Sequence, residues 1–291
     1  MELIEQSVTS YKQEDFTLEG AYKAVERAAR ICYNSADKIT NDSYKSFIEM
    51  LRKNKHTAPF AFGTVHIHIP AYVLITASEC FYNKITHKTI YISDNNIVSF
   101  FDKLPNNWAR VYTTHHDSYI TTNLRVLEEW ENEQWEKNAS VLDLVKDYII
   151  DGYPLDYFEE RPFVICTTSI AMSREYNRYS SLSICERSTR YVEANQIIKP
   201  YWYNENKANS WYFEDIVQIE LDAYNSMLKE EGIKTLTKQQ ARDILPLCTV
   251  TEVAYIGFQD DWDWIINQRT GKGAHPQAQE LAGLIKQEIY G

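Results

Sequence analysis

The chain has 291 residues, with 41 acidic against 30 basic side chains, a formal net charge of −11 and a pI near 5.2. This balance disfavours a nucleic-acid polymer or an anionic membrane as partner, because both need extended basic surfaces, whereas a mononucleotide needs only a local basic pocket. No apolar run is long enough to span a membrane and the first residues lack the pattern of a signal peptide, so we expect a cytoplasmic protein.

The aromatic and cysteine contents narrow the possible class of protein further. The 21 tyrosines and seven tryptophans exceed the needs of a core, so we expect some to line a ligand cleft or a subunit interface. The cysteines are odd in number and form no CxxC pair, which favours reduced thiols over a disulfide framework or a zinc site. For Cys185, the one cysteine in a strongly charged stretch, nearby arginines can lower the pKa, yet a packed small residue is favoured over a nucleophile.

The N-terminal part of the sequence predicts two helices followed by a strand. Apolar positions from Leu18 to Tyr33 have helical spacing, and Asn41 or Asp42 can cap a second helix that runs to about Lys53. From Gly63 onward apolar and polar residues alternate strictly, which predicts a half-buried strand. His66 and His68 share the polar side of that strand, where a solvated face is favoured over a metal site because no third ligand is evident.

The middle of the chain predicts a mixture of helices and strands. We expect a buried helix over 70–82, a short helix over 95–104 capped by Asp94, and a strand at Tyr119 that leads into a helix by Leu127. The acidic run from Glu128 to Glu136 favours a solvated helix face.

In the C-terminal part, Phe163 to Thr168 predicts a strand, and Ser169 or Ser173 can begin a helix that presents Glu175 and Arg178 on one face. An aromatic loop over 200–211, a helix over 213–231 ended by Gly232, and a short helix capped by Thr237 follow. No repeat or linker interrupts the chain, so we expect one domain over residues 1–291.

The stretch from Arg174 to Tyr191 concentrates four arginines and two glutamates in an otherwise acidic chain. Arg187, Ser188, Thr189 and Arg190 are consecutive, so backbone N–H groups, hydroxyls and guanidiniums can converge on a small anion such as a phosphate monoester. The alternative is a helix with a salt-bridged face followed by a polar turn, and the spacing alone does not separate the two.

This stretch resembles the signature of flavin-dependent thymidylate synthases, because Arg178, Ser183, Ser188 and Arg190 fall at the matching spacings. Tyr179 and Ser180 stand where that family has histidine and arginine, and Cys185 stands where many members have Asn, Ser or Gln. The match is specific in spacing and altered in content.

Other segments resemble the same family in colinear order, from about Ala29 to the C-terminus. They are ARICYNS, the segment from Lys55 to Phe60, the start of the helix near Leu124, the Ala-Arg-x-x-Leu-Pro element over 241–246, and the segments around Gly257-Phe258, Arg269 and His275-Pro276. Ala61 and Phe62 replace an acidic residue and a histidine of the family, which puts the usual folate contact in doubt.

The resemblance implies a mixed α/β subunit with a central mixed sheet flanked by helices, assembled as a homotetramer with shared active sites. It implies reductive methylation of dUMP to dTMP with methylenetetrahydrofolate, NADPH and FAD. In that family the flavin supplies the hydride, and the protein supplies charge and positions the nucleotide. Two alternatives stay open: a related flavin enzyme that modifies another pyrimidine nucleotide, and a non-catalytic nucleotide-binding homologue.

The resemblance also implies roles for individual residues. Catalytic roles fall to Arg178, Ser188 and Arg269. The dUMP-binding residues are Glu175, Arg178, Glu186, Arg187, Ser188, Thr189, Arg190, Arg242 and Arg269. The cofactor-binding residues are Ser35, Thr64, Arg178, Tyr179, Ser180 and Glu186. Because Tyr179 and Ser180 cannot replace a guanidinium on a diphosphate, we expect weaker or differently seated FAD, by about 1.5–3 kcal/mol.

Overall fold

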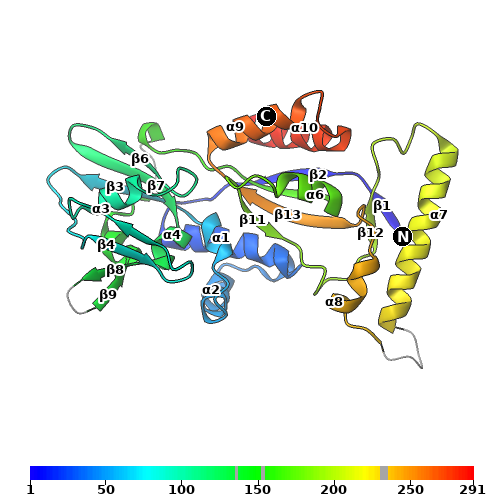
Figure 1. Cartoon of the computed structure of the whole chain (residues 1–291), viewed down its shortest axis with the longest axis horizontal. Coiled ribbons are helices and arrows are strands. Elements are labelled where there is room, and N and C mark those ends of the chain that lie inside the picture. The colour runs from blue at the N-terminus through cyan, green and yellow to red at the C-terminus, as the bar shows by residue number, and fades with distance from the viewer. Residues whose placement is uncertain (135–136, 152–154, 230–234) are drawn as a thin grey trace.

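The computed structural model describes residues 1–134, 137–151, 155–229 and 235–291, and Figure 1 labels its elements. Its helices are α1 (Leu18–Cys32), α2 (Ser43–Lys53), α3 (Ile97–Asp102), α4 (Leu124–Glu129), α5 (Val141–Val145), α6 (Ile170–Tyr176), α7 (Lys207–Lys229), α8 (Lys238–Ala241), α9 (Gln259–Thr270) and α10 (Pro276–Tyr290). Its strands are β1 (Glu2–Ile4), β2 (Ser7–Tyr11), β3 (Thr64–Pro70), β4 (Cys80–Asn83), β5 (Thr89–Tyr91), β6 (Arg110–Thr113), β7 (Asp117–Asn123), β8 (Trp130–Gln134), β9 (Lys137–Ser140), β10 (Phe163–Ser169), β11 (Ser183–Glu186), β12 (Gln196–Ile198) and β13 (Val250–Ile256).

A four-stranded antiparallel sheet in the order β11-β13-β10-β2 forms the middle of the molecule (Figure 1). Alternate side chains of β10 serve its two faces, as a strand buried on both sides requires. Val164 and Cys166 pack toward α6, α9 and α10, whereas Phe163 and Ile165 pack toward α1. The mixed α/β fold class is confirmed; the central sheet pairs antiparallel throughout, and the parallel pairing is that of β1 with β12.

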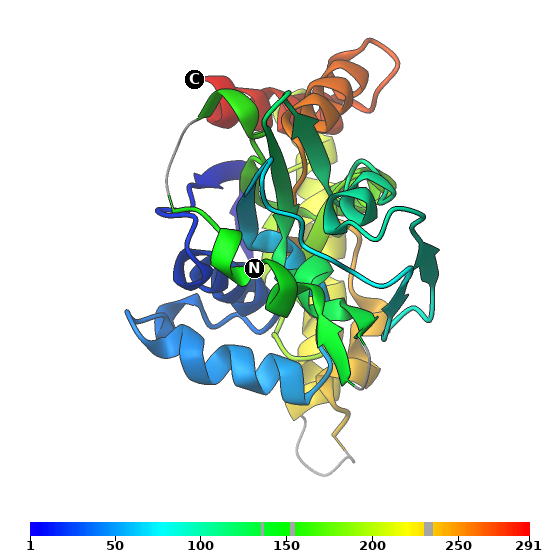
Figure 2. The ribbon, with the colours of Figure 1, turned by 90° about the vertical axis from the view of Figure 1, so that its left-hand side faces the viewer.

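A second lobe at the left of Figure 1 contains two small sheets, β3-β7-β6 and β5-β4-β8-β9. Its core gathers buried side chains from α2, α3, α4 and α5 around Val65, Phe81 and Phe100. Figure 2 views this lobe end-on, with α9 and α10 (orange and red) at the opposite end of the molecule from α2 (light blue). The lobe is thus built from residues that lie between α1 and β10 in the chain.

Helix α1 contributes to both of these cores. Ala21 and Ala29 belong to the core of the second lobe, whereas Ala28 and Ile31 pack beneath the central sheet. Thr17 caps the helix by accepting a hydrogen bond from the backbone N–H of Gly20. Small alanines on both faces let the neighbouring elements approach closely, so α1 joins the two halves of the fold.

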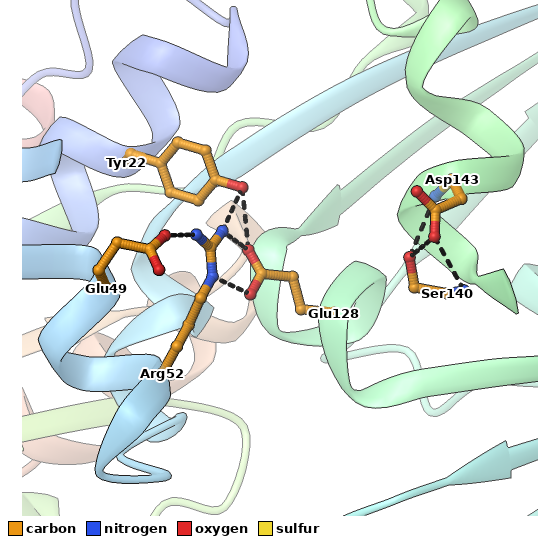
Figure 3. Close-up of polar contacts among 6 residues, drawn as sticks. All are labelled: Tyr22, Glu49, Arg52, Glu128, Ser140 and Asp143. Atoms are coloured by element: carbon orange, nitrogen blue, oxygen red, sulfur yellow. Dashed lines mark hydrogen bonds and ion pairs between the residues drawn. The ribbon is translucent and has the colours of Figure 1, made fainter. Parts of the chain in front are cut away.

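A polar network fastens α1 and α2 to α4 (Figure 3). Arg52 of α2 donates from Nε to one Glu128 oxygen at 3.0 Å and from Nη2 to the other at 2.7 Å, which is a bidentate pair. The Tyr22 hydroxyl donates to Glu128 at 2.9 Å and accepts from Arg52 at 2.8 Å. Glu49 accepts from the remaining Arg52 nitrogen at 2.6 Å. Figure 3 also shows Ser140 and Asp143, which form the capping box of α5.

Several predicted elements are confirmed within one or two residues. They are the helices α1 and α2, the strands β3 and β10, the strand-to-helix step of β7 and α4, and the short helix α8 with its Thr237 cap. Ser169 begins α6, and α3 is capped by Asn96 in place of Asp94. Helix α7 begins at Lys207, inside the predicted loop, and its predicted end at 231–232 lies outside the described residues.

Three expectations about the second lobe are wrong. The buried helix over 70–82 is absent, because Tyr72 and Leu74 are 89% and 64% exposed and the chain enters β4 at Cys80. The acidic run from Glu128 does not form a solvated helix face: Glu128 and Glu129 end α4, where Glu129 is buried, and β8 follows with Trp130 and Asn132 buried; residues 135–136 lie outside the described residues.

The third correction concerns the polar face of β3. His66 is only 4% exposed and lies between the rings of Phe16 and Phe158, at centroid distances of 4.1 and 4.4 Å. His68 is half-buried and contacts Asp117 at 3.0 Å. Within the described ranges, no group of three or more potential metal ligands gathers, and no helix is long and apolar enough to cross a membrane.

Candidate functional site

The charged stretch identified in the sequence lines a cavity of about 1040 Å³. Its walls come from the C-terminal end of α1, from α6, from β11 and the loop that follows it, and from the 3-10 turn Arg242–Ile244 after α8. Elements from three distant parts of the chain therefore meet there. Of the residues predicted to bind dUMP, those that line the cavity are Glu186, Arg187, Ser188, Thr189, Arg190 and Arg242.

The loop after β11 is held by its own backbone. The Arg187 N–H donates to the Glu252 carbonyl at 2.8 Å, and the Ser188 N–H donates to the Cys32 carbonyl at 3.3 Å. These two N–H groups are thus committed to the protein, so the predicted convergence of backbone donors on an anion does not include them. The Arg187 guanidinium pairs with the Glu252 carboxylate at 2.8 Å, which balances its charge.

Three other guanidiniums give the cavity its positive charge. Arg174, Arg190 and Arg242 line it, and in the described part of the chain no carboxylate forms an ion pair with any of them. All three side chains are exposed to solvent in the cavity. Unpaired guanidiniums beside the Ser188 and Thr189 hydroxyls suit a small phosphate-bearing ligand. Arg174 was not among the predicted ligands.

Glu186 is the acidic group at the cavity wall nearest to α6. One carboxylate oxygen accepts from Asn177 Nδ2 at 3.0 Å and the other accepts from Thr251 Oγ1 at 3.1 Å. Both of these partners are neutral, so in these contacts Glu186 engages no arginine. Such a fixed carboxylate can accept hydrogen bonds from a ligand N–H or hydroxyl group.

Sequence reasoning also missed an aromatic wall of the cavity. The Tyr33 hydroxyl and His56 Nδ1 lie 2.9 Å apart, and the Tyr33 ring stacks with Tyr191 at 6.1 Å. All three residues line the cavity. The segments ARICYNS and Lys55 to Phe60 resemble the family in sequence, but their convergence depends on how α1 and α2 pack.

The remaining predicted dUMP ligands form a separate cluster beside α9. Arg269 donates to the Glu175 carboxylate at 2.9 Å and lies over the Tyr179 ring at 5.1 Å. Arg178, 71% exposed, contacts Glu175 at 3.5 Å, as expected for residues three apart. None of these four lines the main cavity, so the structure divides the predicted site into two groups.

The predicted cofactor residues do not converge within one chain. Ser35 is buried and its hydroxyl has no hydrogen-bond partner among the described residues, whereas the buried Thr64 hydroxyl accepts from Arg161 at 3.2 Å. Ser180 lines a smaller cavity of about 220 Å³ with Asn107, Trp108 and Arg125. These predicted cofactor residues therefore lie at separate places in a single subunit.

Cys185 is a packed side chain, as the sequence favoured. It is 4% exposed, and a hydrogen bond with Cys32 together with burial raises its pKa well above the ordinary value. The lowering of this pKa by a nearby arginine is outweighed, because the thiol belongs to the core between α1 and the central sheet.

The fold and cavity together define a mixed α/β protein with a basic pocket whose charge suits a small anionic ligand. The family model described as thymidylate synthase complementing protein matches residues 102–291, and the chain belongs to this family. Membership supports a thymidylate-synthase-like function and a methyltransferase type of enzyme.

Two solved structures are similar to parts or all of the chain. Thymidylate synthase X from Helicobacter pylori, solved with FAD and dUMP, is 18% identical, covers 45% of this chain and 68% of its own, and has a TM-score of 0.35. The UMP/dUMP methylase PolB from Streptomyces cacaoi, bound with 5-Br dUMP, is 13% identical, covers 99% and 92%, and has a TM-score of 0.43. A comparison with curated proteins finds no match to this chain.

Proposed function

We propose that the protein is a thymidylate synthase that methylates dUMP to dTMP, with methylenetetrahydrofolate as carbon donor and with NADPH and FAD as redox partners. The observation that carries the proposal is the cavity in which Arg174, Arg190 and Arg242 have no acidic partner among the described residues. Family membership supplies the reaction type. The size of the cavity, about 1040 Å³, suits a nucleotide with room for part of a second ligand.

In this proposal the cavity residues divide the work of holding the nucleotide. Arg190, Arg242 and the hydroxyls of Ser188 and Thr189 hold the phosphate of dUMP. Asn177 and Glu186 contact the sugar or the uracil ring. Arg174 lies near a uracil carbonyl, where a fixed guanidinium stabilises the negative charge that develops as C5 becomes nucleophilic.

The residues outside the cavity lead us to propose shared sites in a homotetramer. Glu175, Arg178, Tyr179 and Arg269 form a surface cluster that the neighbouring subunit's cavity can use. Since one chain does not bring the predicted flavin residues together, no step of the reaction is assigned to them. We propose that FAD binds only where two subunits meet.

The test is tritium release from 5-tritiated dUMP by the purified protein with FAD, NADPH and methylenetetrahydrofolate, with the nucleotide product identified in the same tube. We expect release together with dTMP. Release with a different product would move the assignment to a related enzyme that modifies another pyrimidine nucleotide.

The divided flavin residues favour one second candidate, a nucleotide-binding homologue without catalysis. In that case dUMP binds with no tritium release at saturating FAD. Measuring dUMP binding by calorimetry and FAD binding by flavin fluorescence on the same sample separates this candidate from an enzyme that has lost its cofactor during purification.

A further inference from the structure

Two thiols meet at the wall of the main cavity. Cys32 is the last residue of α1, Cys185 lies in β11, and α1 packs against β11. Cys32 packs against the buried cluster that contains Cys185, and both residues line the cavity. Neither is engaged in a disulfide. The proposed function uses neither thiol.

We propose that Cys32 and Cys185 form a modification site at which a hydroperoxide entering the cavity converts the two thiols to a disulfide. The two side chains are neighbours before oxidation, because Cys32 packs against the cluster that contains Cys185 and both line one cavity. The opening of the cavity gives a small oxidant access to Cys32, which is partly exposed, whereas Cys185 is 4% exposed.

The two thiols are chemically unequal, which fixes the order of events. The Cys185 thiol donates to the Cys32 sulfur and thereby lowers the pKa of Cys32, so Cys32 is the nucleophile. The same hydrogen bond, together with burial, raises the pKa of Cys185. Cys185 therefore stays protonated and acts as the resolving thiol. Redox-sensitive cysteines commonly combine an accessible thiolate with an adjacent resolving partner.

The reaction balances with the hydroperoxide as the only oxidant. The Cys32 thiolate attacks one peroxide oxygen, the O–O bond breaks, and the departing oxygen takes a proton to leave as water or an alcohol. The Cys185 sulfur then attacks the sulfenic acid on Cys32, the S–S bond forms, and the S–O bond breaks. The departing hydroxide takes the Cys185 proton and leaves as water, so two thiols have lost two electrons to the peroxide.

The disulfide changes the ligand-binding loop because Cys32 supports that loop directly. The Cys32 carbonyl accepts the Ser188 N–H at 3.3 Å, and the next residue, Tyr33, stacks with Tyr191 at 6.1 Å. Drawing Cys32 toward β11 therefore shifts both ends of the segment from Ser188 to Tyr191. We expect the affinity for a phosphate ligand to fall about tenfold.

The chemical part of the proposal is tested by thiol mapping of the full-length protein after stoichiometric hydrogen peroxide. We expect a non-reduced peptide map to contain Cys32 linked to Cys185. Cys32→Ser should leave Cys185 reduced, and Cys185→Ser should stop at a Cys32 sulfenic acid that dimedone traps. Cys248→Ser is the matched control, because this thiol lies outside the cavity and burial raises its pKa to about 11.

Irreversible oxidation of Cys32 in the wild type, linkage of other cysteines, or full retention of both thiols would overturn the proposal. If Cys185→Ser does not fold, as judged by its melting temperature, the peptide map of the wild type still tests whether the disulfide forms. This part does not depend on the proposed function.

The effect on the loop does rest on the proposed function, with dUMP as the probe. Calorimetry should show weaker dUMP binding to the oxidised protein and recovery after dithiothreitol. A disulfide with unchanged affinity would contradict the coupling to the loop. If the reduced protein does not bind dUMP at all, the proposed function fails while the mapped disulfide stands.

Discussion

Arg174 and Arg178 lie about one helical turn apart, and only Arg174 reaches the cavity. Helix α6 ends at Tyr176, where the Asn177 N–H donates to the Ser173 carbonyl at 2.8 Å, so Arg178 belongs to a turn and points to Glu175 instead. The consecutive residues from Glu186 to Arg190 were predictable as one group, because neighbours in a loop share a location. Arg174 was not, because its direction depends on where a helix ends.

Replacing Arg174 by methionine removes one positive charge from the cavity. We expect dUMP affinity to fall about ten- to a hundredfold, since a charge-assisted hydrogen bond contributes about 1.5–3 kcal/mol. Lys286→Met is the control. Lys286 is exposed on α10, so this substitution also removes one positive charge, but at a position outside the cavity. Equal affinities of the two variants, measured by calorimetry, would contradict a ligand role for Arg174.

The buried His66 predicts a dependence of stability on pH. Burial, with a smaller contribution from the charge of Arg161, lowers the pKa of His66 from 6.5 to about 4. The unfolded chain therefore binds this proton first, so the stability contribution is complete above pH ~6.5 and is lost as the pH falls toward 4. Between pH ~7.5 and ~5 the loss from this residue is about 2 kcal/mol.

His66→Phe removes the titrating group while keeping a ring between Phe16 and Phe158. Urea unfolding of both proteins at the two pH values is the measurement, and the variant should lose less stability on acidification than the wild type. His68→Phe is the comparison, because His68 is half-buried beside Asp117. An identical pH dependence for wild type and His66→Phe would show that His66 does not titrate in this way.

At the scale of elements, amphipathic helices and buried strands were predictable and the second lobe was not. The run over 70–82 is apolar, yet Tyr72 and Leu74 are exposed. Its hydrophobicity alone therefore did not indicate a buried helix. From Trp130 onward the acidic run becomes β8, where Trp130 and Asn132 are buried and Glu131 between them is half-buried. Period-2 burial outweighed the charge.

The network of Figure 3 predicts unequal effects for its two acids. Glu128, with its side chain 18% exposed, forms the bidentate pair with Arg52, whereas Glu49 is 71% exposed and contacts one nitrogen. Glu128→Gln should lower the free energy of unfolding by about 1 kcal/mol and Glu49→Gln by almost nothing. Thermal unfolding followed by circular dichroism measures both, and equal shifts would contradict the network.

At the scale of the molecule, we propose that the chain folds as one domain, because α1 places buried side chains in both main cores. The sequence indicated this only through the lack of a linker. Assembly depends on surfaces, which periodicity does not reveal. Trp211, Tyr212, Ile216 and Ile219 leave an apolar surface on α7, each 56–62% exposed, and such a surface favours association with another protein surface.

We predict a homotetramer, with a mass by light scattering of four times the 34.1 kDa chain. The double change Ile216→Glu and Ile219→Glu should lower that mass, whereas Tyr72→Glu, on an 89% exposed side chain of the other lobe, should not. A monomeric mass for the wild type at all concentrations would contradict the assembly.

Shared sites allow a further test. Mixing Arg174→Met with Arg178→Met, each weakened when alone, should raise tritium release above that of either variant. The two residues lie in different groups of one chain, the cavity and the cluster beside α9. A mixed tetramer can therefore hold an intact cavity from one variant next to an intact cluster from the other.

The order of strands in the central sheet determines when each strand can pair during synthesis on the ribosome. Strand β2 pairs with β10, and β10 pairs with β13, so the first strand of this sheet has no neighbour until residues 163–169 have emerged. The lobe between them is made of nearer neighbours and can fold while the sheet is still incomplete. The nascent chain therefore carries the unpaired strand β2 for more than half of its translation, and the loop after β11 gains its supporting strand β13 only near the end.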